Sequence, residues 1–324
     1  MRTLPPRDQL TICFAHAAYR TQERFALRKT GLRSVEVRTH DELKACIGEV
    51  DVLVVSGLWR NELIATAPKL AFIQSISAGV DQYSQEQLRA AGIRMASAQG
   101  ANRNAVSEHA MALILGLARK LAEGRDNQHK HFWRGMISDI PTREDELGGK
   151  TLVIVGMGRI GSRLAKLARA FDMKVIGVKR DVSSGPGDAD KVVSTDALLE
   201  VLPSADYVAL TCPLTPQTQN IINARSLAAM KPSAFLVNVA RGKVVDETAL
   251  LDALKTRTIA GAAIDCAWEE PLPESSPLWT CPNLVITPHS AGETQCYEDN
   301  IIDLLLENLG VLGKGGTELR NGIV

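Results

Sequence analysis

Short apolar runs alternate with longer stretches of helical periodicity along almost the whole chain. The short runs are rich in Val, Ile and other residues that favour β-strands, and turn residues separate them. A first series comprises TICFA, VEVRT, DVLVVS, AFIQSIS and IRMAS, and a second comprises TLVIVG, MKVIGV, YVALTC, AFLVNVA, IAGAAID and NLVITP. Strands that alternate with helices predict parallel sheets with helical crossovers. The predicted fold class is therefore α/β, with two doubly wound parallel-sheet domains.

Two longer segments are predicted to be helices. The sequence AVSEHAMALILGLARKLAEG, residues 105–124, lies between the two series of strands, and we expect one long apolar helix that crosses between the domains. A polar stretch around Trp133 to Glu146 follows it. After the last strand, Ile301, Leu305 and Leu309 recur at helical spacing and predict an amphipathic helix.

Composition and charge exclude several classes of partner. The 324 residues carry 37 Lys plus Arg and 37 Asp plus Glu, so no net positive field attracts nucleic acid. The longest apolar runs, MALILGL and IIDLLLENLGVL, are shorter than the roughly 20 residues that a membrane span requires. The first residues, MRTLPPRDQLTICF, carry prolines and charges where a signal peptide needs a continuous apolar stretch. The six cysteines are scattered, which predicts reduced thiols, and His129 and His131 stand two apart, a spacing that would point them away from each other on a helix, so no metal site is expected. We therefore expect a cytoplasmic protein that binds neither membranes nor nucleic acid.

A glycine-rich turn follows the first strand of the second series. Gly156, Gly158 and Gly161 stand between TLVIVG and a helical pattern, in the Gly-x-Gly-x-x-Gly spacing. The first two glycines allow a tight turn and close approach to a pyrophosphate, and the third lets the helix pack on the strand. The helix N-terminus would then face the phosphates. Glycines that serve packing alone are the alternative, but the strand, turn and helix context predicts a dinucleotide site.

The end of the next strand bears on which dinucleotide binds. In NAD-binding versions of this fold an acidic residue there accepts hydrogen bonds from the adenosine ribose. Here Lys179 and Arg180 occupy that place, and Asp181 comes only after the strand has turned. The two cations could be solvated charges without a ligand. We favour a 2′-phosphate site, which predicts NADP as the preferred cofactor and leaves NAD as the alternative.

Four polar side chains follow later strands of the same series. Arg241 follows AFLVNVA, Asp265 and Glu270 follow IAGAAI, and His289 follows NLVITP. Because the carboxyl ends of parallel strands meet at one edge of a sheet, all four are expected on the side of the glycine-rich turn. Each of them alone would be read as a surface charge or a satisfied core residue. Their convergence predicts a site with an acid, a base and an anion binder.

These blocks resemble a known family. NVARGKVVDETAL, AAIDCAWEEPLPESSPLW, NLVITPHSAG and LVIVGMGRIG are similar to the signature blocks of the D-isomer-specific 2-hydroxyacid dehydrogenases, and SAGVD and NAVSEHAMALILGLAR extend the likeness. The resemblance implies a Rossmann dinucleotide-binding domain at 101–291 and a flavodoxin-like substrate (catalytic) domain formed by 1–100 plus 292–324. It also implies a homodimer that pairs through the dinucleotide domains, and the apolar stretch from Ala110 to Leu121 is expected to need a partner to bury it.

The resemblance assigns roles to the matching residues. Arg241 would hold the substrate carboxylate and carbonyl oxygen, and His289, paired with Glu270, would donate the proton. Asp265 would lie near the nicotinamide amide, and the backbone N–H groups of Ala78 and Gly79 would bind the substrate carboxylate. The expected dinucleotide contacts are Gly156, Gly158, Arg159, Ile160, Gly161, Lys179, Arg180, Cys212, Pro213, Thr218, Val239, Ala240, Arg241, Asp265 and His289.

The predicted reaction is hydride transfer between NAD(P)H and a small 2-oxo acid. Imidazole, with an unperturbed pKa of about 6.5, can donate a proton near neutral pH. Leu58 and Trp59, after DVLVVS, are expected near the substrate side chain, with simple packing as the alternative. Two other functions stay open: an NAD-linked enzyme similar to phosphoglycerate dehydrogenase, and a non-catalytic dinucleotide-sensing protein similar to corepressors related to this family.

Overall fold

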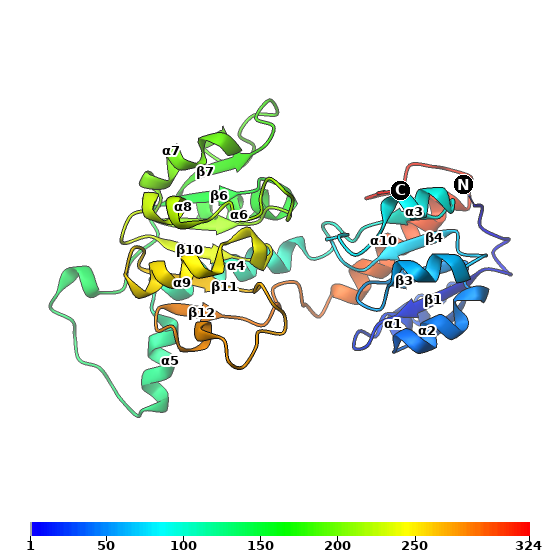
Figure 1. The fold of residues 1–324 in the computed structure, drawn as a ribbon, viewed down its shortest axis with the longest axis horizontal. Helices are drawn as coiled ribbons and strands as arrows, with labels where there is room; N and C mark the ends of the chain where they lie inside the picture. Colours follow the sequence, from blue (N-terminus) through cyan, green and yellow to red (C-terminus); the bar gives the residue numbers. More distant parts are fainter. Residues whose placement is uncertain (1) are drawn as a thin grey trace. The chain divides into compact units, whose positions relative to one another are not determined.

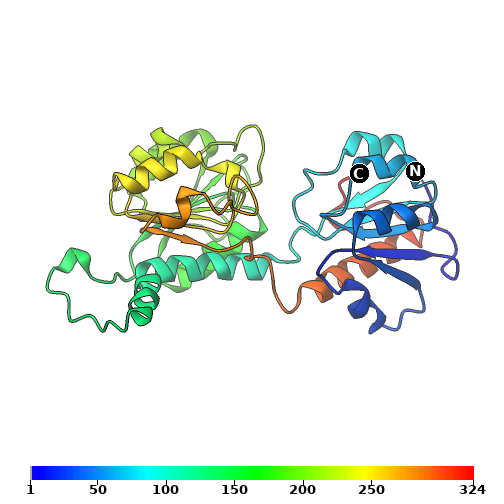
Figure 2. The same ribbon diagram turned by 60° about the horizontal axis from the view of Figure 1, so that its bottom comes forward.

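The computed structural model describes residues 2–324, which divide into two compact units. Unit 1 consists of the chain up to Asn102 together with Glu293–Val324, and unit 2 consists of Arg103–Gly292 (Figures 1 and 2). Unit 1 is therefore discontinuous in sequence, whereas unit 2 is one continuous segment. Within residues 2–324, no helix is both long enough and apolar enough to span a membrane.

The sheet of unit 1 is parallel throughout. Its strands are β1 (Thr11–Ala15), β2 (Arg33–Val37), β3 (Val52–Val55), β4 (Phe72–Ser75) and β5 (Arg94–Ala96). They lie in the order β2-β1-β3-β4-β5, which is the flavodoxin-like order. The central strands are buried on both faces, which explains why they read as continuous apolar runs. The sequence-based fold class is confirmed for this unit.

Helices cover both faces of this sheet. The helices of unit 1 are α1 (Thr21–Ala26), α2 (His40–Cys46), α3 (Gln85–Ala90) and α10 (Tyr297–Leu312). One core joins Ile12 and Phe14 of β1 to α1 and α10, and the other joins Cys13 and Ala15 to α2 and α3. Alternate residues of the same strand thus point into opposite cores. The predicted C-terminal amphipathic helix is α10, and it completes a core built mostly from the first hundred residues.

The sheet of unit 2 is also parallel. Its strands are β6 (Thr151–Val155), β7 (Lys174–Lys179), β8 (Lys191–Ser194), β9 (Tyr207–Leu210), β10 (Phe235–Asn238), β11 (Gly261–Ile264) and β12 (Leu284–Ile286). Their order is β12-β11-β10-β9-β6-β7-β8, the doubly wound order of a Rossmann domain extended by one strand. All of them except β8 were predicted. The strand order reverses between β6 and β9, and ligands bind at such a switch point.

Two helical layers enclose this second sheet. α4 (Arg103–Ala118) and α6 (Arg159–Ala170) pack on one face, and α7 (Leu198–Val201), α8 (Ala224–Ala229) and α9 (Glu247–Lys255) on the other (Figure 1). Short 3-10 helices lie in the connections of both units, at Ile47–Glu49, Asn61–Thr66, Ile140–Thr142, Thr195–Ala197, Leu202–Ser204, Gly242–Val244 and Pro277–Thr280.

The long helix predicted over 105–124 is in fact two helices. α4 ends at Ala118, Lys120 has a left-handed backbone with φ 51°, and α5 (Leu121–His129) begins after it. The expectation that Ala110 to Leu121 needs a partner to bury it is also wrong for one face of the stretch. Ala110, Met111, Leu113, Ile114 and Ala118 are buried in the core of unit 2, because this face of α4 packs on α6 and the sheet.

Candidate functional site

The glycine-rich turn lies at the carboxyl edge of the sheet, beside the switch point. Gly156 has φ 104°, and a Cβ there would come within 2.6 Å of the Cys212 backbone. A Cβ on Gly161 would overlap the Gly156 carbonyl oxygen. Gly158, the N-cap of α6, faces open space and has no side chain to cap the first N–H groups of the helix. The open space at Gly158 therefore leaves room for a close-lying pyrophosphate, whereas side chains at positions 156 and 161 would collide with the protein backbone.

The loop after β9 lies against this turn. Thr211 donates a hydrogen bond from Oγ1 to the Gly156 carbonyl (2.6 Å), and Thr218 donates from Oγ1 to the Pro213 carbonyl (2.6 Å). The second bond closes the loop on itself. Burial raises the pKa of the Cys212 thiol to about 11, so this cysteine is a neutral packing group. The structure thus places Cys212, one of the residues expected in the dinucleotide site, directly beside Gly156.

Lys179 is the last residue of β7, and its loop carries both signs of charge. Lys179 Nζ donates to Ser184 Oγ (2.8 Å) and to the Gly185 carbonyl (2.7 Å), which uses two of the three N–H donors of the ammonium. Asp181 accepts from the Ser183 backbone N–H (2.9 Å). Hydrogen bonding from the side chain and backbone of Ser183 lowers the pKa of Asp181, so its carboxylate is charged at neutral pH. Residues 179–181 therefore present two cations and one anion.

Arg241 stands just after β10 and is fixed by a buried amide. Asn238 donates from Nδ2 to the Arg241 carbonyl (3.0 Å) and accepts at Oδ1 from the Ala240 N–H (3.0 Å). The Arg241 guanidinium donates to the Ala240 carbonyl (2.8 Å) through one of its nitrogens. A Cβ on Gly242 would overlap the Ala267 carbonyl, so glycine allows this loop to lie against the loop that follows β11. That contact brings Arg241 to the neighbourhood of Glu270.

His289 and Glu270 form a hydrogen-bonded pair. His289 Nδ1 lies 2.7 Å from Glu270 Oε2, and the other oxygen, Oε1, accepts from the Ala267 N–H (2.9 Å). Because a carboxylate only accepts, the Nδ1 atom carries a proton, and Nε2 is left for another partner. The two side chains are 46% and 39% exposed, so a small molecule can reach them. With its Nδ1 proton held by Glu270, the imidazole can take a second proton on Nε2 and deliver that proton from Nε2.

Asp265 holds the loop that carries His289. Its side chain is buried, and its oxygens accept from the Thr287 hydroxyl (2.6 Å) and from the backbone N–H groups of Ser290 (3.0 Å) and Ala291 (2.9 Å). His289 itself has a left-handed backbone, with φ 54°. The sequence-based expectation placed Asp265 near the nicotinamide. In the structure the hydrogen bonds of its side chain are with the loop that presents His289.

The residues expected from unit 1 lie in loops after its strands. Ala78 is exposed and Gly79 half-buried in the loop after β4, and Leu58 is half-buried after β3. Trp59 corrects our expectation: it is only 1% exposed and packs in the core of unit 1 against the ring of Tyr83. Its indole N–H donates to Asn61 Oδ1 (3.0 Å). A side chain so fully covered offers no surface to a substrate, and the alternative of simple packing applies to it.

Sequence reasoning missed Asn238 and Thr287. Asn238 is the lone polar residue of AFLVNVA and the last residue of β10, and Thr287 directly follows the apolar residues of β12. Because a buried polar group needs a partner, a lone Asn or Thr at the end of a buried strand indicates a hydrogen bond to the loop that follows. That signal was available in the sequence.

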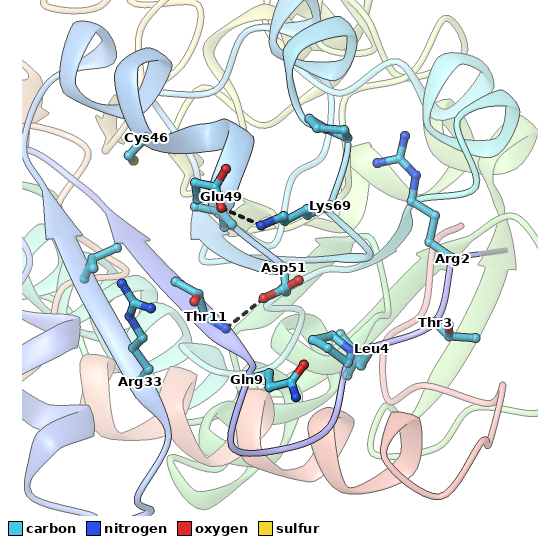
Figure 3. Close-up of a pocket in the computed structure, with 14 residues that line it drawn as sticks. Arg2, Thr3, Leu4, Gln9, Thr11, Arg33, Cys46, Glu49, Asp51 and Lys69 are labelled. Carbon is cyan, nitrogen blue, oxygen red and sulfur yellow. Dashed lines mark hydrogen bonds and ion pairs between the residues drawn. The ribbon is translucent and has the colours of Figure 1, made fainter.

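A wide pocket of about 860 Å³ in unit 1 is not part of this site. It lies where β1, β2 and β3 begin, whereas ligands of doubly wound sheets bind where strands end. Figure 3 shows Lys69 paired with Glu49, and Asp51 accepting from the Thr11 N–H (2.8 Å). Arg2 donates to two backbone carbonyls at its rim. These charges of the pocket are satisfied by the protein itself.

Comparisons with known proteins show which chains this protein resembles. Residues 111–291 match the family described as "D-isomer specific 2-hydroxyacid dehydrogenase, NAD binding domain". The chain is 36% identical over 282 residues to a glyoxylate reductase of Pyrococcus furiosus, covering 85% of this chain and 83% of that protein. It is 36% identical over 289 residues to a D-3-phosphoglycerate dehydrogenase of Methanocaldococcus jannaschii, covering 88% of this chain but only 54% of that longer protein. A crystal structure of a D-isomer specific 2-hydroxyacid dehydrogenase family protein from Aeromonas salmonicida superposes with a TM-score of 0.85 and 29% identity, covering 98% of this chain and 99% of that one.

Proposed function

The chain belongs to the D-isomer-specific 2-hydroxyacid dehydrogenase family, and from this premise we propose that it interconverts a small 2-oxo acid and its D-2-hydroxy acid. The observation that carries the proposal is the pair of His289 and Glu270, 2.7 Å apart, at the sheet edge that also holds Arg241 and the glycine-rich turn. A bound nicotinamide dinucleotide would supply or accept the hydride. The residues of unit 2 would supply the proton and bind the anion.

His289 is the proposed proton donor. Reduction places negative charge on the carbonyl oxygen, and a proton donor within hydrogen-bond reach of that oxygen lowers the barrier. Because Nδ1 is held by Glu270, only Nε2 is left to face the substrate. Glu270 therefore fixes the orientation of the imidazole and stabilises its protonated form during the reaction. In the oxidation direction the same nitrogen would accept the proton of the hydroxyl group.

Arg241 is the proposed carboxylate binder. Its planar guanidinium can donate two parallel hydrogen bonds to a carboxylate and also polarise the adjacent carbonyl, which a lysine ammonium cannot do in one geometry. In unit 1, the backbone N–H groups of Ala78 and Gly79 are proposed to bind a substrate carboxylate, and Leu58 to lie near a substrate side chain.

We also propose that NADPH is preferred over NADH. Lys179 and Arg180 supply cationic donors for a 2′-phosphate at the end of β7, where an acidic residue would bind the ribose hydroxyls of NAD. Lys179 has one N–H donor left after its bonds to Ser184 and Gly185. Asp181 opposes this preference because it adds a negative charge to the same loop.

For the assembly we propose a homodimer, with contacts that differ from those first expected. The apolar face of α4 is occupied within unit 2, whereas the segment after it is not. Five large apolar side chains on and after α5 are exposed, and this segment extends away from the sheet of unit 2 (Figures 1 and 2): Leu121, Phe132, Trp133, Met136 and Ile140. Such a patch favours an interface. Light scattering at micromolar concentration should show a dimer, and Trp133→Ser with Met136→Ser should shift it to monomer.

The direct test is a panel of 2-oxo acids assayed with NADPH and NADH. Glyoxylate, hydroxypyruvate and bulkier aliphatic and aromatic 2-oxo acids should be compared, and the product of any turnover should be the D isomer. Oxidation of 3-phosphoglycerate with NAD would favour the second candidate, which the similarity to a D-3-phosphoglycerate dehydrogenase supports. Tight NADPH binding without turnover of any acid would contradict both and favour a dinucleotide-sensing protein.

A further inference from the structure

A second histidine reaches the loop that carries His289. His109 lies on α4, far from His289 in sequence, and its Nε2 is 3.0 Å from Thr287 Oγ1. The same nitrogen is 3.6 Å from Asp265 Oδ1, and the imidazole is 24% exposed. His109, Thr287 and Asp265 all belong to unit 2. They form a chain of hydrogen bonds that runs from the helix to the loop.

The direction of these hydrogen bonds follows from their chemistry. A carboxylate only accepts, so the single hydroxyl proton of Thr287 points to Asp265 Oδ1, 2.6 Å away. The Thr287 oxygen can then only accept from the imidazole, which requires the proton of His109 to be on Nε2. His109 therefore donates to Thr287, and Thr287 donates to Asp265. Removal of the first donor leaves the Thr287 oxygen without its partner from α4.

Asp265 links the hydrogen bonds of His109 and Thr287 to the backbone around His289. Its carboxylate also accepts from the N–H groups of Ser290 and Ala291, so the chain on both sides of His289 is tied to one buried group. His289 has φ 54°, a conformation that a residue with a side chain adopts only when its surroundings hold it there. The His289 N–H donates to the Thr287 carbonyl (3.0 Å), which adds a third tie.

We propose that His109 is a positioning residue for His289. It holds the Thr287 hydroxyl in the orientation that serves Asp265, and Asp265 in turn holds the loop that aims His289 Nε2 at the substrate. This role rests on the proposed function, because it assumes that His289 transfers the proton. It predicts an effect on kcat and not on binding, since Arg241 and the glycine-rich turn are held by other contacts.

The first pair of variants is His109→Leu and His109→Gln. Leucine removes the donor, whereas the amide nitrogen of glutamine can take the place of Nε2. His109→Leu should lower kcat about tenfold, the effect of one lost hydrogen bond in a buried network, with KM for the 2-oxo acid and Kd for NADPH changed less than about twofold. His109→Gln should keep kcat within about threefold of the unmodified protein. The melting temperature and the Kd for NADPH check that both variants are folded.

The second pair is Thr287→Val and Thr287→Ser, which remove or keep the hydroxyl. Thr287→Val should lower kcat at least as much as His109→Leu does. Thr287→Ser, which keeps the hydroxyl, should have a kcat close to that of the unmodified protein. The double variant His109→Leu with Thr287→Val should lose no more than Thr287→Val alone, because both act through one hydroxyl. Additive losses, or an unchanged kcat in His109→Leu, would overturn the role of His109. If Thr287→Val does not fold, the His109 pair decides alone. Failure of the unmodified protein to turn over any 2-oxo acid would instead overturn the proposed function, and with it this role.

Discussion

Two loops at the same sheet edge are held in opposite ways. The loop after β7 is exposed, and the bonds of Lys179 and Asp181 join residues within six positions of each other. The loop that carries His289 is held by residues far away in the sequence. Ser290 and Ala291 donate to Asp265, which lies 25 and 26 positions before them. Thr287 pairs with His109 of α4, 178 positions away. The loop that carries His289 is fixed by buried, long-range hydrogen bonds. The charges that we propose select the cofactor lie on the surface instead, where they can be exchanged without disturbing the core.

The largest effect on the rate should come from a substitution in the loop that carries His289. In His289→Gln the side chain can no longer take or give a proton, so the rate of reduction should fall about 10² to 10⁴ fold. The Kd for NADPH, measured by fluorescence titration, should stay nearly the same, because the glycine-rich turn is untouched. Near-normal turnover in this variant would remove His289 from the mechanism.

Arg241→Lys tests whether charge alone is enough at the loop after β10. Lysine keeps the positive charge but loses the planar pair of donors, so kcat/KM for the 2-oxo acid should fall about 100-fold, with KM raised and kcat lowered. Lys243→Arg, a neighbouring exchange between the same two residue types, is the matched control and should leave both constants unchanged. Unaltered kinetics in Arg241→Lys would place Arg241 outside the site.

Substitutions in the exposed loop after β7 should change the preference between NADPH and NADH without lowering kcat. One or two charge-assisted hydrogen bonds to a 2′-phosphate imply about a 10 to 100 fold preference for NADPH in kcat/KM. Lys179→Asp combined with Arg180→Ser should reverse that preference, while the kcat reached with saturating cofactor stays close to that of the unmodified protein. Equal or better use of NADH by the unmodified protein, at matched ionic strength, would contradict the proposed preference.

The smallest effect is expected at Asp181, the acidic residue of the loop after β7. Its pKa is lowered by Ser183, so the carboxylate is charged at neutral pH and repels a phosphate. Asp181→Asn should raise kcat/KM for NADPH about two to fivefold at low ionic strength, and less at high salt, because exposed charges are screened. Asp188→Asn, at another exposed acid of the same connection, is the control. If Asp181→Asn raised kcat/KM for NADH and left kcat/KM for NADPH unchanged, the proposed repulsion between Asp181 and the 2′-phosphate would be wrong.

The sequence predicted the sheets and the edge where the polar side chains meet, because those features follow from local patterns. Apolar runs mark buried parallel strands, and the spacing of Gly156, Gly158 and Gly161 marks the turn. It did not predict β8, since KVVS is a short edge strand with little apolar character. Nor did it predict the break at Lys120, because no glycine or proline marks it. Trp59 and the bonds of Asp265 were missed for another reason: burial and long-range partners depend on the assembled core.

The discontinuity of unit 1 has a consequence for synthesis on the ribosome. α10 supplies Ile301, Ile302 and Leu305 to the core that also holds Phe14 and Phe72. This core therefore stays open until residues 297–312 have been translated, after the whole of unit 2. Since domains fold as units during translation, unit 2 can fold while the earlier strands wait with apolar surface exposed. Ribosome-bound chains that end near residue 292 should therefore recruit holding chaperones through β1 to β5, and chains that include α10 should release them.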